Sequence, residues 1–463
     1  MAERDVVSQR NKRKFVDDDY FVYVLNNKNR DATMEYWTCE RKTQCRAKIH
    51  VSNDRIVKHV GEHTHAADVN AVKASVLLDN MKHDAETSND TTRNIIRDAV
   101  GQQDDGVLAA LPSRPTLTRR IQRARRRANP IPPLPTARHG CEIPAEYTTT
   151  SNGRRFLMFD SGTDDHDRIL IFSTDDSLDA MVRNTNWFVD GTFKCAPEIY
   201  YQVFTVHVFI HGAVIPVLYA LLPNKQQATY ERLFTALNSM RQFNPTSILA
   251  DFEMSSINAV GSVYPNATVS GCFFHFTQCI YRKVQDSGLQ NEYRNTNFNL
   301  FVRMLAALAF VPVNGVVDTF DTLLEGHAPA TAQPIIDYFE DNFIGRLTRR
   351  HVRRAPLFSL DVWNVSGRVE DVLPRTNNSV EGWHRAFQSS LSCAHPSLWK
   401  FIEQIRKEEA LQHFNIIQIM NGASVAGRKK YRCCDARIRN LVQRYATMNT
   451  MEFIRAIAHN LTV

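Results

Sequence analysis

The chain has 463 residues, a formal net charge of +7, 43% hydrophobic residues and 23% charged residues, which is ordinary for a soluble globular protein. No apolar run approaches the roughly 18–20 residues of a membrane span, and the charged beginning MAERDVVSQRNKRK is unlike a secretory signal. We therefore expect neither a membrane protein nor a secreted one. The nine cysteines are not spaced like a disulfide framework, which indicates a reducing compartment.

Composition divides the chain into regions. Residues 1–68 are aromatic and carry Cys and His at short spacing, whereas residues 69–128 are polar and helical in pattern. The stretch NPIPPLP that follows is typical of a stiff boundary. We expect four domains or segments: a small zinc-stabilised β-rich domain at 1–68, a helical basic linker at 69–135, a large α/β domain at 155–410, and a helical basic tail at 411–463.

The first region has the spacing of a metal site. In EYWTCERKTQCRAKIHVSNDRIVKHVGEHTHAAD, Cys39 and Cys45 precede His63 and His65. Zinc takes four nitrogen or sulfur ligands in a tetrahedron, and two histidines at i and i+2 of an extended segment face the same side. These four residues predict a structural Zn²⁺ that supplies folding free energy to a domain too small to hold together by core burial. Two further histidines fit the spacing less well: His50 and His59.

Residues 112–139 hold eight arginines and no acidic residue. A helix through TLTRRIQRARRR places Arg119, Arg123 and Arg126 on one face, and Arg127 follows directly. Such a face suits a DNA backbone, where phosphate contacts position a protein without specifying sequence. The alternatives are a solvated linker and a nuclear import signal. The same alternatives apply to two further basic clusters, at 346–354 and 428–432.

The large domain begins with strand patterns. The stretches WFVDGTF, YQVFTVHVFIHG and AVIPVLYALLP are rich in β-branched and aromatic residues, and His211-Gly212 lies where a tight hairpin turn would join the second and third. A helical pattern at 230–240, the strand TSILADFE, a short helix and the strand ATVSGCFFHF follow. This order predicts an RNase H-like mixed sheet flanked by helices.

After about residue 283 the pattern is helical only, and we expect an all-α insertion over about 283–375. Three apolar stripes at helical spacing are interpreted as core-facing. They comprise Phe301, Met304, Leu305 and Leu308; Val316, Phe320, Leu323 and Leu324; and Ile336, Phe339 and Phe343.

Two of the predicted strands end in an aspartate, Asp190 after WFV and Asp251 after ILA. If the strands are parallel neighbours, both carboxylates meet at the carboxyl edge of the sheet, where they repel unless a divalent cation is bound. A two-metal site usually needs a third carboxylate. The candidate is Glu381 in LPRTNNSVEGWHRAF, although Asn378 and Glu381 also have the spacing of a capping box, which this stretch alone favours. Without partners, Asp190 would be a turn residue.

Four motifs in order, FVDGTFK, LADFE, GCFFHF and RTNNSVEGWHR, resemble the Mutator-like element (MULE) transposases over about residues 155–410. The resemblance implies an Asp-Asp-Glu triad of Asp190, Asp251 and Glu381 on an RNase H-like core. It also implies Mg²⁺ or Mn²⁺ as cofactor, and cleavage and strand transfer of DNA at the ends of a mobile element.

Residues beside the triad have open roles. Cys272 and His275 match the Cys-x-x-His signature of this family, and a packed cysteine with a hydrogen-bonded histidine is favoured over zinc, because no two further ligands are evident in the nearby sequence. His384 and Arg385 follow Glu381 on a neighbouring helical face, where they would contact DNA phosphate or serve as surface charge.

Residues 15–68 resemble the FLYWCH zinc finger through Tyr23, Tyr36-Trp37-Thr38-Cys39, Cys45 and His63-Thr64-His65. We expect Tyr36 and Trp37 to pack within the finger. The resemblance implies DNA or protein binding, and in a transposase it favours recognition of the terminal repeats.

The leading hypothesis is therefore a nuclear DNA transposase that works as a homo-oligomer assembled on DNA. The alternative is a domesticated, transposase-derived DNA-binding regulator without catalysis. The stretch YRCCDARIRN lacks the SWIM-type zinc pattern of plant relatives, so the resemblance assigns no DNA contact to the C-terminal region.

Overall fold

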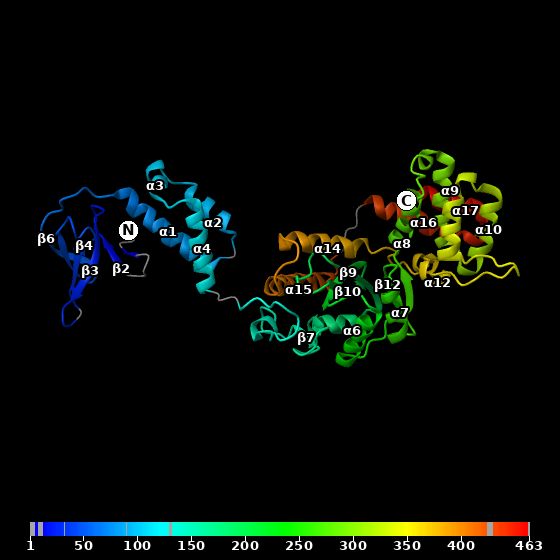
Figure 1. Ribbon diagram of the computed structural model, residues 1–463, viewed down its shortest axis with the longest axis horizontal. Coiled ribbons are helices and arrows are strands. Elements are labelled where there is room, and N and C mark those ends of the chain that lie inside the picture. Colours follow the sequence, from blue (N-terminus) through cyan, green and yellow to red (C-terminus); the bar gives the residue numbers. More distant parts are fainter. Residues whose placement is uncertain are drawn as a thin grey trace. The chain divides into compact units, whose positions relative to one another are not determined.

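The computed structural model forms two compact units, Met1–Pro132 and Pro133–Val463. The structure describes residues 5–7, 13–31, 33–88, 90–128, 132–423 and 429–461. In Figure 1 the chain runs from the blue sheet through the cyan helices of the first unit into the second unit. None of the helices among the described residues is long and apolar enough to cross a membrane.

The first unit opens with a six-stranded antiparallel meander in sequence order. Its strands are β1 (Asp5–Val7), β2 (Arg13–Val16), β3 (Val22–Lys28), β4 (Glu35–Cys39), β5 (Lys48–Ser52) and β6 (Arg55–Val60). Asn53 and Asp54, both at positive φ, close the β5–β6 hairpin with the turn chemistry that such short connections require. Trp37 is fully buried at the centre of the sheet core, which confirms the packing role expected for it.

Four helices complete this unit. They are α1 (Val69–Thr87), α2 (Thr92–Val100), α3 (Asp105–Ala110) and α4 (Arg114–Ala128). Their apolar faces meet in one core, in which Leu77, Ile95 and Ile121 are buried. Val16 of β2 packs on Val72 of α1, so the sheet and the helices share a contact. The finger and the helical segment therefore form one compact body.

The second unit contains a seven-stranded mixed sheet in the order β13-β12-β9-β10-β11-β8-β7. Its strands are β7 (Leu157–Asp160), β8 (Leu170–Phe172), β9 (Asn186–Thr192), β10 (Gln202–Ile210), β11 (Ala213–Leu222), β12 (Ser247–Ala250) and β13 (Thr268–Gly271). The predicted order of three strands, helix, strand, helix and strand is confirmed from β9 to β13. His211 and Gly212, both at positive φ, make the tight β10–β11 turn.

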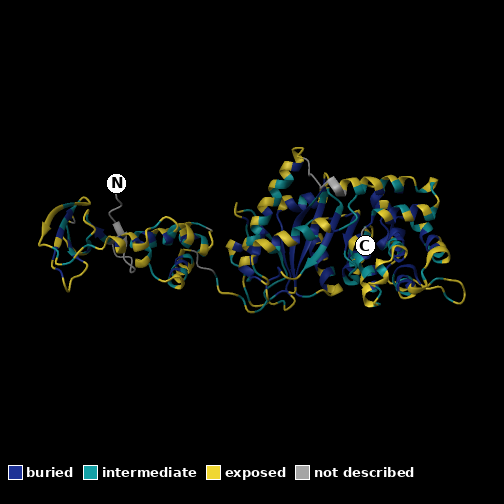
Figure 2. Ribbon diagram, turned by 90° about the horizontal axis from the view of Figure 1, so that it is seen from above, coloured by how far each residue is buried: buried dark blue, intermediate teal, exposed yellow. Residues whose placement is uncertain are grey.

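Helices cover both faces of this sheet, and Figure 2 shows its buried strands between helices with exposed outer faces. The helices of the sheet layer are α5 (Asp175–Arg183), α6 (Gln227–Met240), α7 (Met254–Val263), α8 (Phe273–Asp286), α14 (Asn378–Leu391) and α15 (Leu398–Met420). Alternate residues of β11 separate the two cores. Leu218 and Ala220 pack with α5, α6 and α7, whereas Tyr219 and Leu221 pack with α14 and α15.

A second, helical core extends from α8. It contains α9 (Thr296–Ala307), α10 (Val316–His327), α11 (Gln333–Phe339), α12 (Leu360–Trp363), α13 (Ser366–Glu370), α16 (Lys429–Gln443) and α17 (Thr450–Asn460). Short 3₁₀ segments lie at Ala145–Tyr147, Glu292–Arg294, Leu308–Phe310, Val313–Gly315, Ala330–Ala332 and Tyr445–Thr447, and a π segment at Glu340–Ile344. The three predicted stripes face this core, and only Leu324 stays partly exposed. Helix α17 packs there too, with Phe453 and Ile457 fully buried.

Candidate functional site

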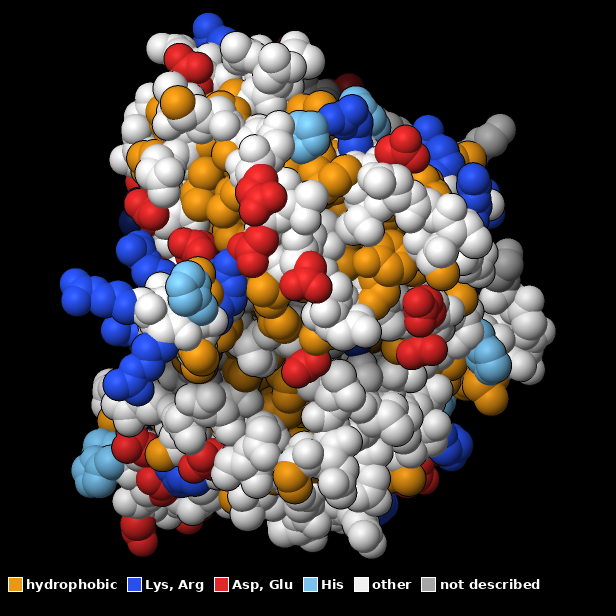
Figure 3. All heavy atoms as spheres, turned by 90° about the vertical axis from the view of Figure 1, so that its right-hand side faces the viewer, with side chains coloured by type: hydrophobic (Ala, Val, Ile, Leu, Met, Phe, Trp, Pro, Cys, Tyr) orange, Lys and Arg blue, Asp and Glu red, His pale blue; other side chains and the backbone are white. Residues whose placement is uncertain are grey.

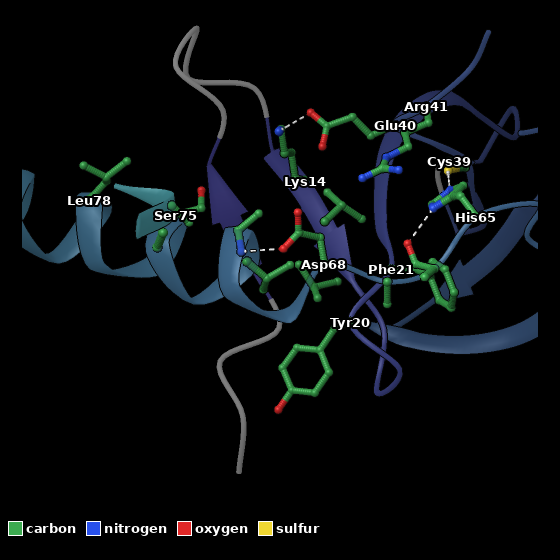
Figure 4. Close-up of a pocket in the computed structure, with 18 of the residues that line it drawn as sticks. Lys14, Tyr20, Phe21, Cys39, Glu40, Arg41, His65, Asp68, Ser75 and Leu78 are labelled. Atoms are coloured by element: carbon green, nitrogen blue, oxygen red, sulfur yellow. Dashed lines mark hydrogen bonds and ion pairs between the residues drawn. The ribbon is translucent and has the colours of Figure 1, made fainter. Parts of the chain in front are cut away.

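The first candidate site is the Cys/His cluster of the finger. Cys39 ends β4, Cys45 lies in the following loop, and His63 and His65 follow β6. Cys39 Sγ lies 3.2 Å from His65 Nε2, and Cys45 Sγ lies 3.3 Å from His63 Nδ1. All four ligand atoms lie within 4.8 Å of one another, and Figure 4 shows the His65 ring directed at the Cys39 sulfur. The sequence prediction of one four-ligand cluster agrees with this geometry.

Neighbouring groups orient the cluster. The other nitrogen of His63, Nε2, lies 2.8 Å from the hydroxyl of Tyr23, which donates to Asp17, and Phe21 stacks on the same imidazole at 3.6 Å between ring centroids. Burial lowers the pKa of His63, which favours the neutral ring that binds metal. The spare candidate His50 packs edge-on against Tyr36 instead.

Nearby backbone N–H groups lower the pKa of the Cys45 thiol, which favours metal binding. Burial raises its pKa, but backbone N–H groups of Ala47 and Thr64 outweigh burial and lower the pKa of Cys45 to about 7. A thiol of low pKa is deprotonated readily, and the thiolate is the form that binds zinc. The donor set therefore fits a structural zinc ion.

The second candidate site lies at the carboxyl edge of the larger sheet. Strands β9 and β12 are parallel neighbours, with Phe188 opposite Leu249, so Asp190 and Asp251 reach the same level two residues later. The side chain of Asp190 is only 10% exposed. Burial raises its pKa, and the nearby Asp251 carboxylate raises it further, against the opposing effect of His384. The sequence prediction that these two carboxylates meet agrees with the register.

Glu381, in the first turn of α14, faces the same edge. His275 of α8 lies between two carboxylates, with Nδ1 2.7 Å from Asp251 Oδ1 and Nε2 3.4 Å from Glu381 Oε1. Burial lowers the pKa of His275, but Asp251 and Cys272 outweigh burial and raise it to about 11. One imidazole ring thus spans the gap between residues that are 130 positions apart.

The capping alternative for Glu381 is wrong. The residue that precedes α14 is Asn377, not Asn378, and its side chain makes no capping hydrogen bond. The Asn377 amide instead lies 3.3 Å from Asp251 Oδ1 and 3.4 Å from the Val189 carbonyl oxygen. Asn377 was not anticipated from the sequence, because no local pattern relates it to Asp251.

His384 does not lie at the surface, so its expected position beside the exposed Arg385 is wrong. Its ring is buried, with Nδ1 3.3 Å from Asp190 Oδ2 and Nε2 3.1 Å from Thr205 Oγ1. Thr205 also lies 3.0 Å from Nε2 of the buried His207. His384 is four residues after the buried Val380, and this spacing places it on the core-facing side of α14.

The predicted basic face of α4 is exposed. Leu117, Ile121 and Ala124 turn inward on the opposite side of the helix. The four arginines singled out from the sequence are all exposed: Arg119, Arg123, Arg126 and Arg127. A cavity of about 330 Å³ between the finger and the helices receives further basic side chains: Lys14, Arg41 and Arg120.

Residues 346–354 form a hairpin whose strands meet at the Leu347–Arg353 bridge. At its base, Arg353 contacts Asp321 and lies 2.9 Å from Glu340, and Arg346 lies 2.8 Å from Asp341. The tip residues Arg349 and Arg350 are exposed, and neither has an acidic partner within the described chain.

This arginine hairpin is the yellow loop at the right-hand end of Figure 1, and basic side chains project from that end of the unit in Figure 3. A Cβ at Gly345, where φ is 90°, would collide with the Arg354 carbonyl, so glycine is needed where the hairpin begins. The other basic cluster, 428–432, lies mostly outside the residues whose side chains the structure describes.

The chain thus has an antiparallel sheet with a Cys/His cluster and a mixed sheet with acidic side chains at its carboxyl edge, and the Cys/His cluster is typical of a metal-binding protein. Residues 6–65 match the FLYWCH zinc finger domain, and residues 186–279 match the MULE transposase domain. The chain thus contains both domains and carries the DNA-binding character that they imply. The MULE match includes Asp190, Asp251, Cys272 and His275, and it ends before Glu381. None of the curated proteins matches the chain.

Proposed function

We propose that this protein is a Mutator-like DNA transposase that cleaves phosphodiester bonds and transfers strands at element ends. The observation that carries the proposal is the convergence of Asp190, Asp251 and Glu381 from three distant segments. His275 lies between Asp251 and Glu381, and the β9–β12 register brings Asp190 beside Asp251. The strand order β11-β10-β9-β12-β13, with β9, β12 and β13 parallel, supports an RNase H-like core. The helical segment at about 283–375 then corresponds to an insertion before the third carboxylate.

The donor set fits a hard divalent cation, because the three side chains supply carboxylate oxygens and the Asp190 carboxylate is buried beside Asp251. Bound Mg²⁺ or Mn²⁺ would neutralise phosphate charge and lower the pKa of coordinated water.

The chain's own residues have positioning roles in this proposal. His384 holds one oxygen of Asp190, Asn377 holds Oδ1 of Asp251, and His275 holds Glu381. Catalysis of phosphoryl transfer depends mainly on such fixed geometry and charge.

The remaining surfaces support DNA engagement. In the proposal, the first unit recognises the terminal repeats through the finger and contacts phosphate through the arginine face of α4. The arginine hairpin holds duplex DNA near the helical core of the second unit. This division assigns residues 1–68 to the finger, 69–135 to the basic linker, 155–410 to the transposase domain and 411–463 to a C-terminal helical segment. In this proposal the protein acts on chromosomal DNA in the nucleus, and it assembles as a homo-oligomer to pair the two element ends.

A second candidate is a transposase-derived DNA-binding regulator without catalysis. The observation that favours it is the end of the MULE match at residue 279, which leaves Glu381 outside the matched range. In that case the His275 contacts with Asp251 and Glu381 serve only to relieve the repulsion between the carboxylates.

Nicking of DNA that carries the flanking repeats separates the two candidates. The transposase proposal expects Mg²⁺- or Mn²⁺-dependent nicking that is lost in Asp190→Ala, while DNA affinity is kept. Equal nicking by the wild type and Asp190→Ala would reject the assigned site. Tight, repeat-specific binding without any nicking by the wild type would favour the regulator.

A further inference from the structure

We propose that Asp251, Cys272 and His275 form a second transition-metal site, suited to Zn²⁺. This site lies at the carboxyl edge of the larger sheet, beside the three carboxylates. Their ligand atoms all lie within 4.8 Å of one another. The chain contains this cluster in addition to the finger, and the site stands whether or not the protein cleaves DNA.

Rigid elements build the cluster. Asp251 directly follows β12, Cys272 directly follows β13, and these strands are parallel neighbours with Ala250 opposite Gly271. The Cys272 amide donates to the Ala250 carbonyl at 2.8 Å, which ties the two strand ends together. His275 lies in the first turn of α8, which begins at Phe273. Sites supported by strands and helices hold their ligands more precisely than sites on loops.

The chemistry of the three groups selects the metal. A thiolate and an imidazole are ligands of Zn²⁺ and related transition metals, whereas Mg²⁺ takes oxygen ligands. Three protein ligands leave one position of a tetrahedron open for water. Cys272 is fully buried, and Asp251 Oδ1 lies 2.7 Å from His275 Nδ1. This donor set therefore differs from the all-carboxylate set proposed for catalysis.

Neighbouring groups orient these ligands as they do in known metal sites. Asn377 donates its backbone N–H to Cys272 Sγ at 3.2 Å and its side-chain amide to Asp251 Oδ1 at 3.3 Å. His275 Nδ1 lies 2.7 Å from Asp251 Oδ1, and Nε2 lies 3.4 Å from Glu381 Oε1. A histidine that binds metal through one nitrogen commonly gives the other N–H to a carboxylate or another acceptor.

The finger of the same chain uses the same arrangement. His63 faces Cys45 with Nδ1, while its Nε2 lies 2.8 Å from the Tyr23 hydroxyl. The alternative without a metal is an ion pair between Asp251 and His275, with Cys272 packed beside it. An ion pair alone gives no role to the Cys272 sulfur, which accepts a backbone N–H at the point where the other two groups meet.

A zinc ion at this site would also hold two of the three proposed catalytic carboxylates in place. His275 and Asn377 both contact the Asp251 carboxylate at Oδ1. A zinc ion bound on that side would fix Asp251 and, through His275, Glu381. We therefore assign the second ion the role of holding Asp251 and Glu381 in position at the carboxyl edge of the sheet.

Zinc content of the full-length protein, purified without chelators, tests the proposal. The expected result is about two zinc ions per chain in the wild type, about one in Cys272→Ala, about one in Cys39→Ser, and none in the double variant. Cys195→Ala is the matched control, because Cys195 is also fully buried in this unit and should keep both ions. One ion in the wild type and an unchanged value in Cys272→Ala would overturn the proposal.

Cobalt substitution gives a second readout that is independent of DNA cleavage. In full-length protein carrying Cys39→Ser and Cys45→Ser, Co²⁺ should still produce a thiolate charge-transfer band. This band should disappear with Cys272→Ala and shift with His275→Gln, whereas Cys195→Ala should leave it unchanged. A band that persists in Cys272→Ala would place the ion elsewhere and reject the assignment. Because neither readout uses nicking, failure of the metal site and failure of the transposase proposal are distinguishable.

Discussion

The two tip arginines of the hairpin provide a quantitative test of DNA contact. Replacing Arg349 and Arg350 with alanine removes exposed cations that have no acidic partner in the described chain, whereas Arg353 at the base is held by Asp321 and Glu340. Each phosphate contact contributes about 0.9 to the slope of log affinity against log salt concentration. Two lost contacts should therefore reduce the magnitude of that slope by about 1.8.

The assay is fluorescence anisotropy of the full-length protein on a labelled duplex, repeated from about 50 to about 200 mM salt. Over that fourfold range, the slope difference predicts that the wild type loses about tenfold more affinity than the double variant. Two other exposed arginines of the same unit, Arg183 and Arg294, form the matched control and should leave the slope unchanged. The reasoning is refuted if the tip variant keeps the wild-type slope, or if the control variant changes it equally.

Three further predictions concern the metal cluster, the hairpin base and the buried histidine. Cys39→Ser should lose the finger zinc and unfold the small sheet, which limited proteolysis and metal analysis would detect, while the melting transition of the second unit stays in place. Arg353→Ala should lower thermal stability more than Arg349→Ala does, because removing it leaves Glu340 without its partner at the hairpin base. Burial lowers the pKa of His207, so the unfolded chain binds a proton below about pH 6.5 that the folded chain does not, and stability falls there by up to about 1.4 kcal/mol per pH unit. His207→Gln should remove that part of the slope in urea unfolding measured between pH 5 and 7.

Each of these has an outcome that contradicts it. Undiminished zinc at the finger in Cys39→Ser would mean that other residues bind the ion. If Arg349→Ala destabilises the protein as much as Arg353→Ala, the distinction between tip and base is wrong. An identical pH dependence of stability in wild type and His207→Gln would show that His207 is protonated equally in both states.

Local patterns in the sequence were enough to predict the order of strands and helices from β9 to β13 and the placement of two aspartates at one sheet edge. Asp190 and Asp251 each follow an apolar strand, and parallel pairing brings such ends to one level, as the Phe188–Leu249 register shows. The finger cluster was predictable because its four ligands lie close together in the sequence, between Cys39 and His65.

Contacts between distant segments were not predictable in the same way. Asn377 contacts Asp251 across 126 residues, and nothing in either stretch specifies the partner. His384 has the spacing of the buried stripe of α14, but its polarity favoured a surface position. Only the partners Asp190 and Thr205, supplied by other strands, make its burial acceptable. Packing of α17 into the helical core likewise depends on residues far away in sequence.

Binding of Mn²⁺, followed by electron paramagnetic resonance, tests the central claim most directly, because it asks whether three distant carboxylates serve one ion pocket. In zinc-loaded full-length protein, the account predicts that Asp190→Asn, Asp251→Asn and Glu381→Gln each weaken the same Mn²⁺ binding. Glu253→Gln is the matched carboxylate control, because Glu253 precedes α7 and accepts a hydrogen bond from the Tyr230 hydroxyl at 3.0 Å. Wild-type Mn²⁺ affinity in Glu381→Gln, together with weakened binding in the two aspartate variants, would contradict a shared three-carboxylate pocket.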